Sequence, residues 1–254
     1  MAVRADATPV EPAVGFVHSW DVVTGADGPG TRLTFFLAGC PLRCAYCHNP
    51  DTWQMRRGTR TGVAEAMTRV TSYAPFLRAA RGGVTASGGE PLLQARFVET
   101  LFRQCRDAGL HTALDTSGYL GARASDALLA DTSLVLLDVK SWDPALYRQV
   151  TGTGEVAPTL AFGHRLAALG VPVWLRYVFV PGLTGDFEDV GQIADYAAGL
   201  GNVERVDVLP FHSMGAAKYE ALGIPYPCAE MRPPTAEEVE AVKEVFRARE
   251  LVAP

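Results

Sequence analysis

This chain of 254 residues lacks any apolar run of the length that a membrane span requires. Its longest apolar runs, such as Leu134 to Leu137, are short, and the opening stretch MAVRADATPVEPAVG contains no continuous apolar core of the kind that a secretory signal needs. The chain also lacks a Ser/Gly-rich linker or a block of like charges that would divide it. We therefore expect a cytoplasmic protein with no membrane partner, made of a flexible tail over residues 1–14 and one domain over residues 15–254.

The chain has no excess of basic residues and few cysteines. Lys and Arg total 23 against 28 Asp and Glu, for a net charge of −5, which argues against nucleic acid as a partner. Only five cysteines are present, and three of them fall within eight residues, at Cys40, Cys44 and Cys47. An odd number with such clustering does not fit a disulfide framework, so we expect thiols that bind metal in a reducing compartment.

Runs rich in β-branched and aromatic residues alternate with segments of helical spacing along the chain. Six strands are predicted, at residues 31–39, 83–90, 111–118, 133–140, 171–182 and 203–212. Six helices are predicted, at residues 63–73, 94–108, 122–130, 159–169, 187–200 and 235–252. This alternation indicates an α/β fold with a parallel sheet, and six units are too few to close an eight-unit barrel. We therefore predict a partial, TIM-like (β/α)6 barrel that is open on one side.

Polar or glycine-rich motifs stand at the ends of these predicted strands. The cysteines follow the first, and the motifs SGGE, DTSG and DVK end the next three, while Arg176 lies within the fifth and His212 ends the sixth. The carboxyl ends of parallel strands meet at one face of such a sheet. The pattern therefore predicts a single site there. Arg176 should face this site because an unpaired charge within an apolar strand would be costly.

The cysteine motif has the spacing C-x3-C-x2-C. A structural zinc site needs four ligands, and His48 is poorly placed to complete one that Cys47 already joins. A four-iron cluster is also normally held by four thiolates, so three thiolates leave one iron open to a substrate or cofactor. A zinc knuckle, or cysteines that are adjacent by coincidence, remain the alternatives for this spacing alone.

Seven motifs in the same order resemble one family: DGPGTR, GCPLRCAYCHNPDTW, GGVTASGGEPLLQ, HTALDTSG, LVLLDVK, VWLRYVFVPG and VERVDVLPFH. The chain resembles the pyruvate formate-lyase activating enzymes of the radical S-adenosylmethionine (SAM) superfamily from about residue 15 to its last helix. The resemblance implies one [4Fe-4S] cluster on Cys40, Cys44 and Cys47, with SAM on the open iron. It also implies reductive cleavage of SAM to a 5′-deoxyadenosyl radical, which abstracts hydrogen from a glycine of the partner enzyme.

Roles for other residues follow from the resemblance. Tyr46 would lie against the adenine, and Asp27 would brace the cofactor or a substrate loop. Asp115, Thr116 and Asp138, with the backbone of Leu136, would form a monovalent-cation site. The implied cofactor-binding residues are Tyr46, Cys47, His48, Gly88, Gly89, Glu90, Asp138, Val139, Lys140, Arg176 and His212. The implied catalytic residues are Cys40, Cys44, Cys47, Lys140 and Arg176.

Three functions remain open from sequence. The first is a monomeric activase for pyruvate formate-lyase or another glycyl-radical enzyme, with reduced flavodoxin or ferredoxin as the electron donor. The second is a radical SAM enzyme that acts on a small molecule. The third is an electron carrier or zinc-binding module without enzymatic activity, which would not need polar motifs at successive strand ends. Residues 51–82 contain no cysteine, which favours an activase with a single cluster.

Overall fold

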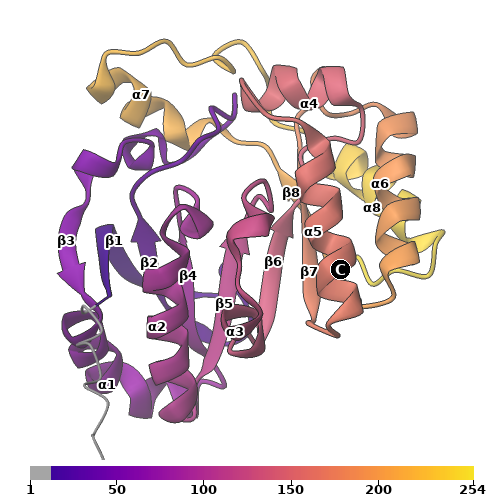
Figure 1. The fold of residues 1–254 in the computed structure, drawn as a ribbon. Coiled ribbons are helices and arrows are strands. Elements are labelled where there is room, and N and C mark those ends of the chain that lie inside the picture. Colours follow the sequence, from indigo (N-terminus) through magenta and orange to yellow (C-terminus); the bar gives the residue numbers. More distant parts are fainter. Residues whose placement is uncertain (1–12) are drawn as a thin grey trace, which may run out of the picture.

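The computed structural model describes residues 13–254, which form one curved sheet with helices packed against its outer surface (Figure 1). Eight strands make up the sheet: β1 (Val14–Thr24), β2 (Thr31–Leu37), β3 (Thr59–Gly62), β4 (Gly83–Gly88), β5 (His111–Thr116), β6 (Leu134–Asp138), β7 (Val173–Phe179) and β8 (Val203–Pro210). Eight α-helices accompany them in the described part of the chain: α1 (Val63–Ala79), α2 (Ala95–Asp107), α3 (Asp126–Ala130), α4 (Pro144–Thr151), α5 (Val156–Ala168), α6 (Phe187–Leu200), α7 (Ala216–Leu222) and α8 (Ala236–Arg247).

The strand order is β3-β1-β2-β4-β5-β6-β7-β8. Six of these strands, β2, β4, β5, β6, β7 and β8, run parallel. These six are the strands that the sequence predicts, so the prediction of an open partial barrel is confirmed. Two further strands, β1 and β3, extend the β2 edge in antiparallel pairing and were not predicted. Of the predicted N-terminal tail, residues 1–12 lie outside the described residues, and Val14 already begins β1.

Alternation along the strands separates a barrel interior from a helix-covered exterior. In β7, the side chains of Val173, Leu175 and Tyr177 are buried in the main core under the helices, as expected for one face of a strand. Trp174 and Arg176 therefore face the interior. Trp174 packs there on a small apolar cluster of Ala113, Leu134 and Leu136, which fills part of the barrel interior.

The helices pack on the sheet through one apolar face. In α2, the buried residues recur at the three- and four-residue spacing of a helix face, at Phe97, Val98, Leu101, Phe102 and Cys105. The predicted last helix ends at Arg247 rather than at Val252, because the chain turns back and the carbonyl of Val252 accepts a hydrogen bond from the amide of Val206 in β8. Within residues 13–254, no helix is both long and apolar enough to cross a bilayer.

Candidate active site at the strand ends

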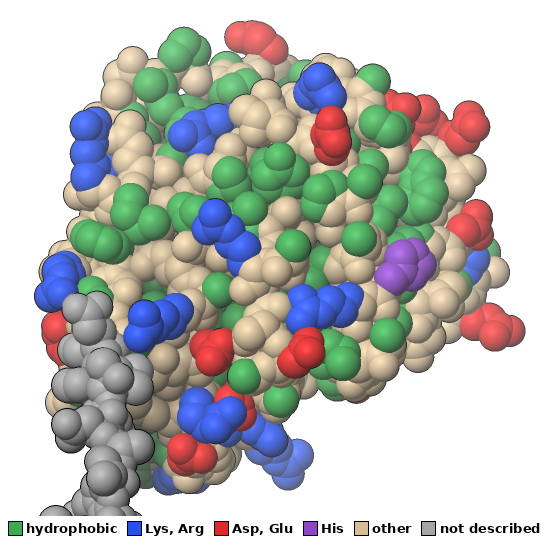
Figure 2. Space-filling model, viewed as in Figure 1, with side chains coloured by type: hydrophobic (Ala, Val, Ile, Leu, Met, Phe, Trp, Pro, Cys, Tyr) green, Lys and Arg blue, Asp and Glu red, His purple; other side chains and the backbone are tan. Residues whose placement is uncertain are grey.

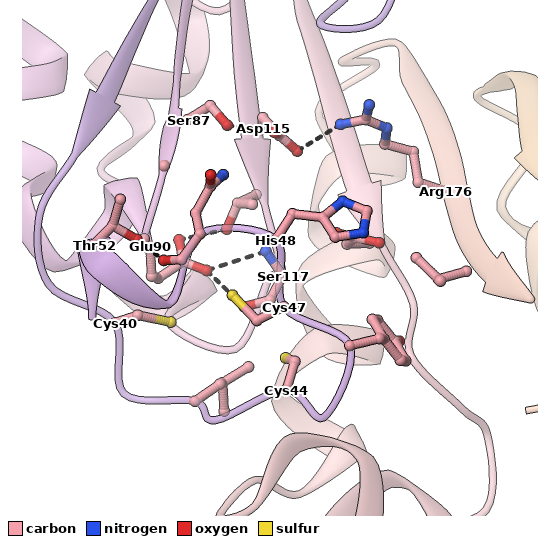
Figure 3. A pocket seen from close by; sticks show the side chains of 18 of the residues that line it. Cys40, Cys44, Cys47, His48, Thr52, Ser87, Glu90, Asp115, Ser117 and Arg176 are labelled. Carbon is pink, nitrogen blue, oxygen red and sulfur yellow. Dashed lines mark hydrogen bonds and ion pairs between the residues drawn. The ribbon is translucent and has the colours of Figure 1, made fainter. Parts of the chain in front are cut away.

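A cavity of about 480 Å³ lies at the carboxyl ends of the parallel strands (Figure 3). The three clustered cysteines, Cys40, Cys44 and Cys47, line it together with motifs from the ends of β4 to β8. The sequence-predicted residues that line it are Asp27, Cys40, Cys44, Tyr46, Cys47, His48, Gly88, Gly89, Glu90, Asp115, Thr116, Asp138, Lys140, Arg176 and His212. Two predicted residues do not, since the side chains of Leu136 and Val139 are buried in apolar clusters.

The loop that carries the cysteines is fixed at both ends by backbone hydrogen bonds. At its start, the amides of Gly39 and Cys40 donate to the carbonyls of Thr52 and Trp53. Further along, the amides of Arg43 and Ala45 donate to carbonyls at the end of α4. These bonds hold the loop so that its three thiols converge on the cavity.

Burial makes these thiols weaker acids than a free cysteine, because it raises the pKa of each. Burial raises the pKa of Cys44 to about 12 even though the ammonium of Lys140 opposes that rise. Burial likewise raises the pKa values of Cys40 and Cys47. A metal centre would therefore have to displace the thiol protons when it binds, which is the usual behaviour of thiolate ligands.

Two glycines allow the end of β4 to lie against the start of the cysteine loop. Gly88 has a φ of +108°, and a Cβ there would come within 2.4 Å of the Leu37 amide nitrogen. A Cβ on Gly89 would come within 2.3 Å of the Gly39 carbonyl oxygen. A side chain at either position would therefore push the end of β4 away from the start of the cysteine loop, so both positions require glycine.

Glu90 cross-links two loops instead of facing the cavity with a free carboxylate. Its carboxylate accepts hydrogen bonds from the hydroxyl of Thr116 at 2.6 Å, the amide and hydroxyl of Ser117, and the amide of Leu92. Glu90 is also almost completely buried. These donors already satisfy both oxygens, so any contact of this segment with a ligand falls to the backbone of the two glycines. Ser117 was missed from sequence because a single serine after a strand carries no signal.

Arg176 lies at the centre of a group of acidic side chains. Its guanidinium donates to Asp115 at 3.0 Å and to the carbonyl of Ala26 at 2.7 Å, while the hydroxyl of Ser87 donates to the other oxygen of Asp115 (Figure 3). Burial opposes the charge of Arg176, but the carboxylates around it outweigh that effect and raise its pKa. Arg176 thereby attaches the β1–β2 loop to the barrel interior.

Asp27 lies in that same loop and lines the cavity. Its carboxylate accepts a hydrogen bond from the hydroxyl of Thr34 at 2.9 Å, and its carbonyl accepts one from Thr85 at 2.8 Å. Burial, reinforced by the nearby charge of Asp115, raises the pKa of Asp27. The loop is thus fixed with an acidic side chain at the cavity wall.

Lys140 and Asp138 form a largely buried ion pair that also lines the cavity. The ammonium lies 2.6 Å from one oxygen of Asp138 and 5.6 Å from the ring centre of Tyr46. Burial disfavours the charged form of Lys140, yet the adjacent carboxylate outweighs burial and raises its pKa well above the ordinary value. Lys140 therefore stays charged and faces the cysteine loop.

His48 and His212 stack on each other at the mouth of the cavity, with ring centres 4.1 Å apart. The Nε2 atom of His48 also lies 3.2 Å from the carbonyl oxygen of His212. The His48 ring therefore contacts both the ring and the backbone of His212. The Nδ1 atom of His212 is buried without a hydrogen-bond partner. The stacked pair thus fixes the orientation of the His212 ring.

Comparison with known proteins decides the family. Residues 34–197 match the radical SAM superfamily. The chain is 40% identical over 235 residues to pyruvate formate-lyase 1-activating enzyme of Escherichia coli (strain K12), covering 92% of this chain and 95% of that one. It is 41% identical over 240 residues to pyruvate formate-lyase-activating enzyme of Staphylococcus epidermidis, covering 92% and 94%. The chain belongs to the pyruvate formate-lyase-activating family of radical SAM enzymes.

Solved structures agree on the fold of this radical SAM chain. A domain of pyruvate-formate lyase-activating enzyme from Bacteroides vulgatus superposes with a TM-score of 0.57 at 24% identity, covering 68% of this chain and 98% of that one. Streptococcus suis SuiB bound to precursor peptide SuiA superposes with a TM-score of 0.65 at 15% identity, covering 90% and 49%. At these identities the likeness speaks for the fold alone.

The cavity fits the two cofactors of a radical SAM enzyme, a [4Fe-4S] cluster and SAM. Three cysteine thiols line the cavity, and no fourth one does. This number matches a cluster in which three irons are held by thiolates and the fourth iron is open. Four lining residues each have a buried polar atom with no partner in the described part of the chain, namely Tyr46, Asp138, Arg176 and His212. These atoms include both donors and acceptors, as the amine, carboxylate and hydroxyl groups of SAM require.

The monovalent-cation site stays a prediction. Asp115, Thr116 and Asp138 line the cavity, but Asp115 and Asp138 already pair with Arg176 and Lys140, and the Thr116 hydroxyl donates to Glu90. Among residues 13–254, no group of three His, Cys, Asp or Glu side chains is arranged to hold a single metal ion.

Replacing Lys140 or His212 by alanine should weaken SAM binding without loss of iron. Lys140→Ala removes a charged donor from the cavity wall, and the loss of a charged hydrogen bond to the cofactor costs about 1.5–3 kcal/mol, so we expect at least about tenfold weaker binding. Titration of the reconstituted enzyme with SAM measures the affinity, and iron analysis measures the cluster. Lys243→Ala, which breaks a pair with Glu240 on α8, is the control. Loss of iron together with binding would show that the two residues support the cluster instead.

Proposed function

We propose that this chain is the activase of pyruvate formate-lyase, on which it generates a glycyl radical. The observation that carries the proposal is the cavity at the strand ends, which is lined both by the three clustered thiols and by buried polar atoms that have no partner. The chain that holds this cavity belongs to the pyruvate formate-lyase-activating family. When bound, the cluster and SAM supply reductive cleavage of the sulfur–C5′ bond and thus a 5′-deoxyadenosyl radical.

The residues of the chain would hold and orient these groups. Cys40, Cys44 and Cys47 would ligate the cluster, and the backbone at Gly88 and Gly89 would meet the methionine moiety of SAM. The resemblance implies that Lys140, Asp138 and His212 contact the polar groups of the cofactor, and the unpartnered or charged atoms of these residues at the cavity support this role. Further contacts with the cofactor would come from Tyr46, His48 and Arg176, which also line the cavity.

A glycine on a backbone loop suits the open barrel. The sheet runs from β3 to β8 without closing, so its strand ends are accessible from the side to a peptide segment (Figure 1). Glycine has no Cβ to hinder approach of its Cα, and hydrogen transfer requires the reacting atoms to be in van der Waals contact. Asp27 and Arg176 line the cavity where such a loop would be positioned.

We also propose that the chain works as a monomer in the cytoplasm and receives its electron from a reduced carrier protein such as flavodoxin or ferredoxin. All five cysteines are free thiols, which fits a reducing compartment. One electron is consumed each time SAM is cleaved, so a one-electron donor is a chemical requirement of the reaction.

A short peptide spanning the partner's radical-bearing glycine should stimulate SAM cleavage. With reconstituted enzyme, SAM and dithionite, we expect 5′-deoxyadenosine and methionine to form in equal amounts, and to form faster when the peptide is present. The matched peptide with alanine in place of the glycine should stimulate less, because its Cβ hinders approach. Stimulation by a small molecule, with no response to the peptide, would favour a small-molecule radical SAM enzyme instead.

A further inference from the structure

Four arginines next to the cysteine loop have no acidic partner. Between residues 40 and 62 the chain carries Arg43, Arg56, Arg57 and Arg60 but a single acidic residue, Asp51, which pairs with Lys218. All four arginines are exposed, and none forms an ion pair in the described structure. Several exposed or partly exposed arginines elsewhere do pair with a carboxylate, namely Arg103, Arg148, Arg165, Arg232, Arg247 and Arg249.

These arginines, which we call the arginine surface, stand out against the charge of the whole chain. The net charge is −5, yet this segment is positive. Figure 2 shows acidic side chains gathered along the edge over α6 and α8, whereas basic side chains prevail over β3 and its surroundings. A local positive surface on an acidic protein attracts an acidic partner selectively and orients it.

Part of the arginine surface belongs to the cysteine loop itself. Arg43 lies within the loop, donates to the carbonyl of Cys40 at 2.8 Å and places its guanidinium 4.8 Å from the ring centre of Trp53. Trp53 in turn lies close enough to Cys47 to favour its thiolate, which partly offsets the rise in the Cys47 pKa that burial causes. A partner seated on Arg43 therefore lies only one side chain from a predicted cluster ligand.

Arg56 and Arg57 are held against the start of the same loop. They belong to a short 3₁₀ turn, Met55–Arg57, whose first side chain packs on the loop: a Cβ on Gly39 would come within 2.8 Å of the Met55 methyl group. A Cβ on Gly58, directly after the turn, would come equally close to the Ala38 side chain. This packing places the turn that carries Arg56 and Arg57 next to the start of the cysteine loop.

None of the four arginines lines the cavity. A protein substrate must insert its glycine into that cavity, because hydrogen transfer needs contact between the reacting atoms. An electron donor needs only to approach the cysteine loop from outside. The position of the arginine surface, beside the loop and outside the cavity, therefore favours the donor over the substrate as its partner.

We propose that Arg43, Arg56, Arg57 and Arg60 form the docking surface for an acidic one-electron carrier protein. The proposal rests on the proposed function, which consumes one electron for each SAM cleaved. The reduced carrier loses one electron at this surface, leaves oxidised, and the enzyme gains that electron. The opposite charges accelerate encounter and place the carrier beside Trp53 and the cysteine loop.

The test compares the charge-reversed double variant Arg56→Glu/Arg57→Glu with a control of equal charge change. The control is Arg81→Glu/Arg106→Glu, because both of these arginines are exposed, lack a carboxylate partner and precede β4 and β5, at the opposite end of the strands from the cysteines. Binding of an acidic flavodoxin is measured by calorimetric titration of the reconstituted enzyme. The rate of 5′-deoxyadenosine formation is measured with reduced flavodoxin and, separately, with dithionite.

We expect the Arg56/Arg57 variant to bind flavodoxin at least about tenfold more weakly than the unchanged enzyme at low ionic strength. The control should bind almost normally. Exposed charges at the edge of an interface act mainly by steering the partner during encounter, so their position decides the effect. About 0.5 M salt should remove most of the difference, because screening shortens the range of the attraction to a few ångströms. The flavodoxin-driven rate should fall in parallel, while the dithionite-driven rate should stay unchanged.

Unchanged flavodoxin binding in the Arg56/Arg57 variant would overturn the proposal. An equal fall of the dithionite-driven rate would also overturn it, because the arginines would then support the active site. Weaker binding of pyruvate formate-lyase with normal flavodoxin binding would assign the surface to the substrate. A wild-type enzyme that does not cleave SAM with dithionite would refute the proposed function, and the binding titration would still decide the docking surface.

Discussion

Replacing any one of Cys40, Cys44 or Cys47 by alanine should abolish the iron–sulfur centre and all SAM cleavage. After anaerobic reconstitution, the unchanged chain should contain about four irons and four sulfides, and each variant close to none. The reason is structural: these three thiols line one cavity, and no fourth cysteine lines it to replace a lost ligand. Iron and sulfide analysis, together with the absorption spectrum of the anaerobic protein, measures the outcome.

The two remaining cysteines provide matched controls. Cys105 is buried in α2, where its sulfur lies 3.8 Å from that of Met67, and Cys228 is buried in a small apolar cluster with Tyr46 and Phe211. Neither lines the cavity, so Cys105→Ala and Cys228→Ala should keep the full iron content. Stoichiometric zinc in protein isolated without oxygen, with no uptake of iron, would contradict the cluster assignment.

Replacing Arg176 by methionine should destabilise the fold strongly. The change leaves the Asp115 carboxylate without its cation and releases the Ala26 carbonyl, and breaking a buried pair from one side costs about 3–5 kcal/mol. The pKa of Asp27, already raised by burial and by Asp115, should rise further once a nearby positive charge is lost. An acid whose folded-state pKa is raised costs stability when it ionises, so the defect should be larger at pH 7.5 than near pH 5.

Urea unfolding at the two pH values measures this effect. Arg205→Met is the control, because Arg205 pairs with Asp207 near the surface of β8 and such pairs contribute only about 0–1 kcal/mol. Adding Asp115→Asn to Arg176→Met should restore part of the lost stability, since it removes the stranded carboxylate. Equal free energies of unfolding for Arg176→Met and Arg205→Met would show that the Arg176–Asp115 pair does not hold the site together.

The parallel part of the fold could be predicted because each strand is an apolar run with an unusual motif at its end. Strands β1 and β3 could not, for different reasons. β3 is four residues long and polar, TRTG, and carries no strand signal without its partner. β1 alternates buried and exposed residues only over part of its length, and its antiparallel pairing with β2 depends on contacts distant in sequence. Helix α4 did carry a signal, since Asp143 caps it and Pro144 begins it.

The residues of the site could be predicted better than their contacts. Their strand-end positions placed most of them around one cavity. Their hydrogen bonds depend on which neighbours the folded chain brings close, so the sequence did not reveal that Thr116 and Ser117 engage the carboxylate of Glu90. The stacking of His48 on His212 joins residues far apart in the chain and has no sequence signal either.

The central claim is that this chain generates a glycyl radical on pyruvate formate-lyase. Electron paramagnetic resonance of that enzyme, after anaerobic incubation with the reconstituted chain, SAM and a one-electron reductant, tests it most directly. We predict a stable glycyl-radical signal, and none when the radical-bearing glycine of the partner is replaced by alanine. Continued cleavage of SAM with no radical on any pyruvate formate-lyase, including the one from the same source, would contradict the account.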